Sequence, residues 1–286
     1  MAKYIGTYAT SGDVQTALDN SELSRPFIAY TTDNDKVYYG PAADRAVPGD
    51  IVVYSVSDDL LHYIKQADYN TTSYPSASYV PVGVVAYPQA DDAFSGVTGE
   101  ITFMGLNFLD KNKPDTGNTG DNYFTPIFMR PEVDVPELTN YATSGAAITD
   151  MNGKENTDIY LTYATGQSDW RTSKTIADNI DGVVPVCELA WRYITSGTIQ
   201  GDWYVPAAGQ IYKSVMSYFE QINAGLSLTN GNIIVPRNMN MWSSTECNET
   251  NMWCMYDSTT SLSTQSKTTN HYRNARPFCT KLMTCI

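Results

Sequence analysis

Few side chains of this sequence have the chemistry of an active site. Its 286 residues include two histidines, His62 and His271, neither of which lies in a catalytic motif, and no GxSxG nucleophile motif occurs. The adjacent carboxylates Asp58-Asp59 and Asp91-Asp92 could act as an acid and a base, but such pairs are more typical of solvated turns. We therefore expect a protein that is not an enzyme and has no cofactor.

Metal ligands are equally sparse. The number of cysteines is odd and no CxxC pair occurs, so the short paired spacings of a zinc site are missing. Reduced thiols are the favoured interpretation, which fits folding in a reducing cytoplasm. The oxygen-rich loop 110–122 could hold Ca²⁺, but its spacing does not match an EF-hand, and an ordinary solvated loop is favoured. The five cysteines are Cys187, Cys247, Cys254, Cys279 and Cys285.

The charge distribution excludes two classes of partner. The chain has 18 Lys and Arg against 31 Asp and Glu, a formal net charge of −13. The first 200 residues hold 26 acidic and 12 basic side chains, and the last 86 hold 5 and 6. Neither part has the basic face that nucleic acid or an anionic membrane requires. The longest apolar stretch, residues 80–87, is too short to span a membrane, and no apolar segment of a secretory signal follows Met1.

The pattern of apolar residues and turn formers predicts strands and helices in two domains. We expect a small β-rich attachment unit at residues 1–46, with a hairpin of residues 27–30 and 37–39 preceded by a helix at 11–23. The remaining domain is residues 47–286. Its expected strands are 51–56, 79–87 and 100–106, and its expected helices are 154–164 and one that begins after Pro206, contains Ile211, Val215, Phe219 and Ile222, and stops at Gly225.

A polar, nearly uncharged segment distinguishes the end of the chain. Ser, Thr and Asn make up 17 of the 32 residues from Ser243 to Asn274. Composition alone is typical of a flexible linker. Trp242 precedes the segment, Trp253 lies within it and Arg276-Pro-Phe278 follows it, so we expect it to be held on a rigid body.

Two motifs about 40 residues apart resemble a known family. They are Trp203-Tyr-Val-Pro-Ala-Ala-Gly-Gln210 and Trp242-Ser-Ser-Thr-Glu246, followed by Trp253 and Arg276-Pro-Phe278. Together with Asn152-Gly-Lys-Glu-Asn-Thr157 and Pro81-Val-Gly-Val-Val85, they resemble the C-type-lectin-like ligand-binding domains of diversity-generating-retroelement variable proteins. The resemblance covers roughly residues 47–286. It implies a compact α+β domain of C-type-lectin-like fold, with two helices, a twisted antiparallel sheet and long loops.

The resemblance also implies a ligand-binding surface between the second motif and the final Arg-Pro strand, about residues 243–274, which is the variable region in that family. Its implied exposed ligand-binding residues are Cys247, Asn248, Glu249, Thr250, Asn251, Thr259, Ser261, Ser263, Gln265, Lys267, Asn270, Tyr272 and Asn274. Short polar side chains and tyrosines on a rigid frame are also what antibody paratopes use. We expect a structural role for the motif residues Trp203, Pro206, Trp242, Glu246, Trp253, Arg276 and Pro277. Cys247, Met252, Cys254 and Met255 depart from the family pattern.

The resemblance implies a receptor-binding virion component of a phage with a Bacteroides-type host, such as a tail or fibre protein assembled in the host cytoplasm. Its partners would be a bacterial surface protein or glycan, and other virion subunits through residues 1–46; a homo-oligomer is compatible with this role. The alternatives are a structural virion protein without receptor binding and an adhesin of the bacterial cell surface. A formylglycine-generating oxidase shares the fold class, but residues 204–209 lack its charged signature, and Cys279 and Cys285 lie past the Arg-Pro-Phe strand.

Overall fold

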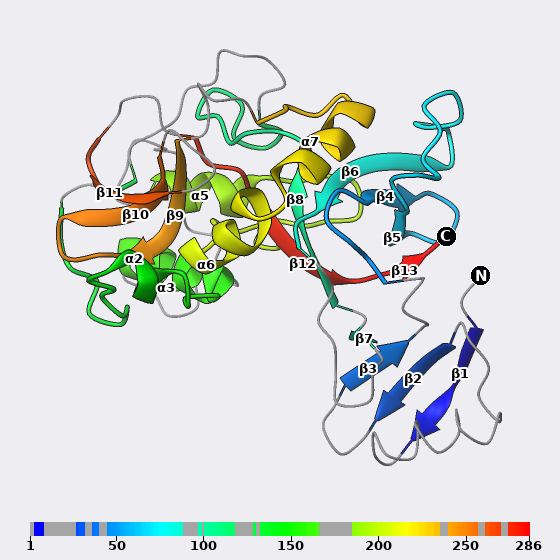
Figure 1. Cartoon of the computed structure of the whole chain (residues 1–286), viewed down its shortest axis with the longest axis horizontal. Helices are drawn as coiled ribbons and strands as arrows, with labels where there is room; N and C mark the ends of the chain where they lie inside the picture. Colours follow the sequence, from blue (N-terminus) through cyan, green and yellow to red (C-terminus); the bar gives the residue numbers. More distant parts are fainter. Residues whose placement is uncertain are drawn as a thin grey trace.

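The protein is an α+β structure with a small sheet at one end of a larger body (Figure 1). It is seen here as a computed structural model. The residues that the structure describes are 3–8, 27–31, 36–39, 45–87, 97–98, 100–117, 128–129, 132–165, 185–234, 240–256, 261–269 and 274–286.

The small sheet has four strands in the order β1-β2-β3-β7. They are β1 (Lys3–Tyr8), β2 (Phe27–Thr31), β3 (Lys36–Tyr39) and β7 (Val97–Thr98). Strands β2 and β3 pair antiparallel, which confirms the expected hairpin, and β1 joins β2 in parallel. The expected helix at 11–23 lies outside the described residues. Strand β7 pairs with β3 although it lies far beyond residue 46, so the sheet is not built from residues 1–46 alone.

A six-stranded sheet in the order β12-β8-β6-β4-β5-β13 forms the centre of the larger body. Its strands are β4 (Ile51–Ser55), β5 (Leu60–Ile64), β6 (Tyr79–Val85), β8 (Glu100–Gly105), β12 (Phe278–Leu282) and β13 (Thr284–Cys285). This confirms the three strands expected near 51–56, 79–87 and 100–106. Neighbours pair antiparallel, except that β13 runs parallel to β5.

Both faces of the six-stranded sheet are covered. Val52 packs into one hydrophobic cluster, while Ile51 and Val53 on either side of it pack into another. Alternate residues of a strand point to opposite faces, so β4 is buried from both sides, as its continuous apolar run predicts. Chain segments after β8 supply the two covering layers (Figure 1).

The helices are α2 (Ser144–Ala147), α3 (Gly153–Thr165), α5 (Pro185–Arg192), α6 (Ala208–Ile211), the π-helical turn η2 (Tyr212–Met216) and α7 (Phe219–Leu228). The expected helix at 154–164 is confirmed as α3. The helix expected after Pro206 is instead three consecutive pieces. Ser214 and Ser217 donate to the carbonyls of Gln210 and Tyr212, both at 2.6 Å, and such back-bonding hydroxyls compete with regular helical hydrogen bonds.

Gly225 does not stop the helix, which continues to Leu228. Its role is close packing: a Cβ at Gly225 would lie 2.3 Å from the carbonyl oxygen of Gly49. Gly49 itself has φ +90°, a backbone conformation that favours glycine. Two glycines therefore bring α7 against the turn that precedes β4.

The polar segment near the C-terminus is mostly β-structure. Strands β9 (Met241–Glu246), β10 (Asn251–Met255) and β11 (Leu262–Ser266) form an antiparallel three-stranded sheet in the order β11-β10-β9. This sheet lies at the far end of the larger body from the β4–β5 hairpin (Figure 1). Neighbouring strands pair with the backbone of the described part of this segment, so it is held on the body, as its flanking aromatic residues predict, and is not a flexible linker.

Candidate ligand-binding surface

Strand β9 is polar in sequence and wholly buried in the structure. Two of its three hydroxyls are hydrogen-bonded: Ser243 Oγ donates to the carbonyl of Trp253 at 2.6 Å, and Thr245 Oγ1 donates to Asp150 Oδ2 at 2.7 Å, whereas Ser244 Oγ is buried without a hydrogen-bond partner among the described residues. Thr245 Oγ1 also accepts from the backbone N–H of Ala208 at 2.8 Å, at the start of α6. Buried polar groups are tolerated when they are hydrogen-bonded, so β9 joins three segments through its side chains.

Asp150 is a buried acceptor that the sequence analysis missed. Its side chain is 2% exposed, and Oδ2 also accepts from Asn156 Nδ2 of α3 at 2.9 Å. Its other oxygen accepts from the backbone N–H of Asn152 at 2.9 Å. The signal for it was the Asp-Met-Asn-Gly turn sequence, because Asp commonly caps the backbone two residues further on. Asp150 thus ties α3 to β9.

The motif residues lie in the core. Trp203, Trp242 and Trp253 are 1%, 0% and 6% exposed. Trp253 donates from Nε1 to the carbonyl of Tyr141 at 2.7 Å, which holds the segment before α2 against β10. Pro206 and Pro277 are also buried.

Arg276 is fully buried and acts as a partner of backbone carbonyls. Its NH1 donates to Gly105 O at 2.8 Å and to Leu106 O at 3.1 Å, and its NH2 donates to Asn232 O at 2.5 Å. Its guanidinium also lies over the ring of Phe108, 4.2 Å from the centroid. Arg276 therefore connects the end of β8, the segment after α7 and the start of β12.

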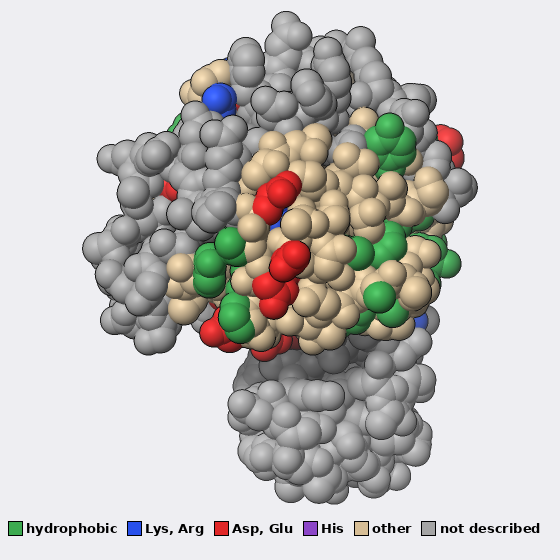
Figure 2. Space-filling model, turned by 90° about the vertical axis from the view of Figure 1, so that its left-hand side faces the viewer, with side chains coloured by type: hydrophobic (Ala, Val, Ile, Leu, Met, Phe, Trp, Pro, Cys, Tyr) green, Lys and Arg blue, Asp and Glu red, His purple; other side chains and the backbone are tan. Residues whose placement is uncertain are grey.

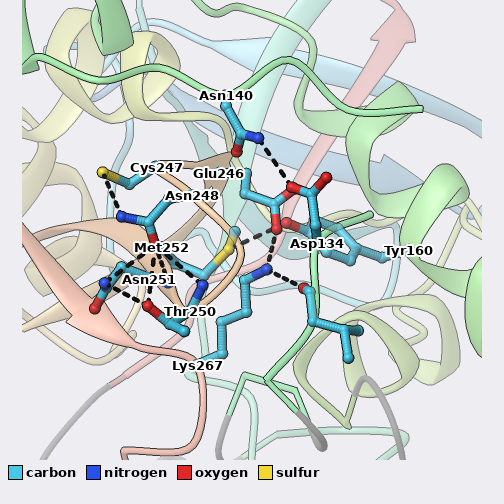
Figure 3. Close-up of polar contacts among 11 residues, drawn as sticks. Asp134, Asn140, Tyr160, Glu246, Cys247, Asn248, Thr250, Asn251, Met252 and Lys267 are labelled. Carbon is cyan, nitrogen blue, oxygen red and sulfur yellow. Dashed lines mark hydrogen bonds and ion pairs between the residues drawn. The ribbon is translucent and has the colours of Figure 1, made fainter. Parts of the chain in front are cut away.

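The β9–β10 turn, residues 247–250, follows the buried strand β9 and reaches the surface. Asn248 and Glu249 are exposed, and Cys247, Thr250 and Asn251 are half-buried. Asn248 Oδ1 accepts from the backbone N–H of Thr250 at 3.0 Å and of Asn251 at 2.9 Å, and from both of their side chains at 3.1 Å (Figure 3). One amide oxygen thus fixes the turn, which presents its remaining polar groups in a defined arrangement.

Strand β11 is an edge strand of the three-stranded sheet. All five of its residues are half-buried, including Ser263 and Gln265, and Ser261 just before it is exposed. Thr259, Asn270 and Tyr272 lie outside the described residues. We use the name display surface for the turn 247–250 together with Ser261 and strand β11.

Two predicted ligand-binding residues are not exposed. Lys267 has no exposed side-chain surface and forms an ion pair with Glu246. Asn274 is 1% exposed, and its backbone pairs with Asn240 and Trp242 at the start of β9. The expectation that they are exposed is therefore wrong: β9 and its neighbours cover both side chains.

The surroundings of the display surface are polar and acidic. Exposed carboxylates lie at Glu132, Glu137 and Glu249, and Glu132 accepts from the hydroxyls of Ser266 and Thr268. These hydrogen bonds lower the pKa of the Glu132 carboxyl. On the face that carries β10 and β11, Figure 2 shows mainly backbone and uncharged polar side chains, with a few acidic side chains and scattered hydrophobic ones between them. Such a surface can donate and accept many hydrogen bonds, and it disfavours anionic partners.

The residues weighed for catalysis are separated. Cys279 lies on β12 and Cys285 on β13, the two opposite edges of the six-stranded sheet, and all five cysteines are free. Burial raises the pKa of the Cys279 thiol, which disfavours a reactive thiolate. His62 Nε2 lies 2.9 Å from Asp58 Oδ2 across the β4–β5 turn. His271 and Asp91-Asp92 lie outside the described residues.

Within the described ranges, no group of three or more His, Cys, Asp or Glu side chains is placed to hold a metal ion. No helix in the described part of the chain has the length and apolar character needed to cross a bilayer. Asp110 at the start of the oxygen-rich loop is buried and accepts from the backbone N–H of Asn112 at 2.8 Å. That contact is typical of an ordinary Asx turn.

Comparisons with known proteins give one structural likeness. No protein-family model matches the chain, and no curated protein matches its sequence. A crystal structure of a fimbrial protein from Bacteroides ovatus is similar, with a TM-score of 0.44 and 18% sequence identity. The match covers 81% of this chain and 48% of the fimbrial protein, so the chain spans about half the length of that protein.

Proposed function

We propose that the protein is a non-enzymatic ligand-binding protein with a C-type-lectin-like fold, and that the display surface contacts its partner. The observation that carries the proposal is the contrast along one hairpin: β9 is wholly buried, while Asn248 and Glu249, two and three residues after it, are exposed and fixed. Rigid frames that present short polar side chains lose little conformational entropy on binding.

The C-type-lectin-like fold is supported by the sequence motifs and by the places they occupy. The Trp242–Glu246 motif forms a buried strand, and Arg276-Pro277 leads into β12, which returns the chain to the sheet of β4. Helix α3 lies against β9 (Figure 1). Retroelement-driven diversification of residues 243–274 is a further part of the proposal.

The proposed partner is a bacterial surface protein or an uncharged glycan, and the proposed setting is a phage virion, where the protein would serve host attachment. The N-terminal sheet would join it to other virion subunits. An adhesin of the bacterial surface is the second candidate. The two are separated by mass spectrometry of purified phage particles, which detects the protein only in the first case.

Receptor binding is tested by removing display-surface side chains that do not support the fold. Glu249→Ala, Ser261→Ala and Gln265→Ala, made together, should abolish adsorption to host cells and leave the melting temperature nearly unchanged, because these side chains are exposed or half-buried. A matched triple variant on the opposite end of the body, Ser57→Ala, Asp68→Ala and Thr72→Ala, should adsorb normally. Adsorption that survives the display-surface triple variant contradicts the proposed surface.

A further inference from the structure

Lys267 and Glu246 meet in a site closed to solvent. Neither side chain has exposed surface, and Lys267 Nζ contacts Glu246 Oε1 and the carbonyl oxygen of Val133. The second carboxylate oxygen, Glu246 Oε2, is buried and has no hydrogen-bond partner (Figure 3). Desolvation makes a buried ion pair expensive unless every lone pair is satisfied, and here one is not.

The surroundings of the pair favour uncharged groups. Burial raises the pKa of the Glu246 carboxyl and outweighs the contact with Lys267, which lowers it; the nearby Asp134 carboxylate adds to the rise. Met252 and Trp242 line the same core, and the hydroxyl of Tyr160 donates to Met252 Sδ at 3.1 Å beside the carboxyl (Figure 3). An amine in contact with a carboxylic acid would leave no buried charge in this closed site.

An uncharged amine held against a carboxyl group is a nucleophile in position to react. We propose that Lys267 and Glu246 condense into an amide, an intramolecular isopeptide cross-link between Nζ and Cδ. The Nζ–Cδ bond forms and the Cδ–Oε1 bond breaks. Ammonium and carboxylate give one amide and one water, which carries Oε1 and two protons from the lysine nitrogen. Nothing is oxidised or reduced, and the net charge is unchanged.

Asp134 is placed to assist this step. Its carboxyl group lies beside that of Glu246, and its Oδ1 accepts from Asn140 Nδ2 at 2.9 Å (Figure 3). The negative charge of Asp134 disfavours the ionised form of the Glu246 carboxyl, and so favours the uncharged acid that the amine attacks.

The cross-link would join the two outer strands of the three-stranded sheet at one end. Glu246 ends β9 and Lys267 follows β11, and the two residues are 21 positions apart. The closed loop would contain all of β10 and β11 and every residue of the turn 247–250. A covalent closure restricts the unfolded chain, so the display surface would be held even when the partner pulls on it.

The proposal is tested by the intact mass of the purified full-length protein. We expect a mass lower than the sequence mass by one water molecule, and a branched peptide after digestion that joins the peptides of Lys267 and Glu246. Lys267→Arg should restore the full sequence mass, because a guanidinium does not attack the carboxyl. An unmodified wild-type mass with two linear peptides overturns the proposal, as does a branched peptide that joins Lys267 to another residue.

Lys65 offers a matched control, because it pairs with the buried carboxylate of Asp50 but is itself 21% exposed. Lys65→Arg should leave the loss of one water intact. Asp134→Asn, an exposed substitution, should lower the linked fraction measured at a fixed time after synthesis. Linkage of Asp134→Asn at the wild-type rate overturns the role of Asp134.

Discussion

Strand β9 and the display surface have similar compositions and opposite environments. Ser243, Ser244 and Thr245 are buried and face the core or neighbouring segments, whereas Asn248, only three residues further on, is exposed. The difference arises from partners: β9 lies between β10 and the segments of Asp150 and Pro206, while β11 is an edge. Polar composition therefore does not identify a surface; the neighbours that each strand packs against do.

Removing a buried side chain of β9 should have the largest effect on the free energy of unfolding. Trp242→Ala should lower the free energy of unfolding by about 3–5 kcal/mol, because it removes a fully buried ring that packs against Phe128 at 5.6 Å. Chemical denaturation measures it. Tyr256→Ala, at a 41% exposed aromatic next to β10, is the control and should change little. If the two variants lost equal free energy of unfolding, the distinction between the buried strand β9 and the exposed residues would be contradicted.

Alkaline pH should weaken the frame through its buried tyrosines. Burial raises the pKa of Tyr193 to about 12, and it also raises the pKa of Tyr160 and Tyr204. The unfolded chain loses these protons near pH 10, and the folded chain retains them, so stability falls as the pH rises from about 10 toward 12. For Tyr193 the loss is about 3 kcal/mol at full ionisation.

Denaturant unfolding below and above pH 10 measures this dependence. Tyr193→Phe removes one ionisable group while keeping the ring, so the slope of stability against pH should become shallower in this variant. An unchanged slope would mean that Tyr193 does not contribute to the alkaline loss.

Two threonines allow the same chemical change in each region. Thr245→Val should cost about 1–3 kcal/mol, because it leaves Asp150 Oδ2 and the N–H of Ala208 each without one hydrogen bond. Thr264→Val on the edge strand β11 should stay within about 0.5 kcal/mol of the wild type. Thermal unfolding of the pair of variants compares them directly. A larger loss for Thr264→Val would contradict the comparison.

The smallest expected effect on stability is at the turn itself. Asn248→Ala removes the oxygen that accepts four hydrogen bonds, but all of these are exposed or half-buried, so we expect a loss of about 1 kcal/mol or less. Binding to the partner should weaken more than stability, because the turn loses its fixed shape. Asn248→Asp, which keeps an acceptor at the same position, should retain most of the binding.

Much of the central sheet followed from the sequence. The apolar runs of β4 and β6 and the periodicity of α3 predicted their places within a few residues, because burial of a regular element leaves a local pattern. Pairings between distant segments leave no such pattern. Strand β11 contains a single apolar residue, and β7 has two residues in all, so only their partners reveal them.

The site was only partly predictable for the same reason. The turn residues 247–250 follow from the motif that precedes them. The burial of Lys267 does not, since lysine is among the residues most often exposed and its partner Glu246 is 21 positions away. Gly225 was misread as a helix end because the local sequence does not show that Gly49 packs against it.

Strand β7 makes the joint between the two sheets double. The chain reaches the larger body once after β3, and then leaves it after β6 to pair with β3 before it returns as β8 (Figure 1). With a single connection, the N-terminal sheet could rotate freely relative to the larger body. Two connections restrict that rotation. A torque applied at the display surface would therefore reach the N-terminal sheet instead of dissipating in the linker. Cutting the chain at residue 46 would remove the connection after β3, and it would also leave β7 without β3, the strand it pairs with.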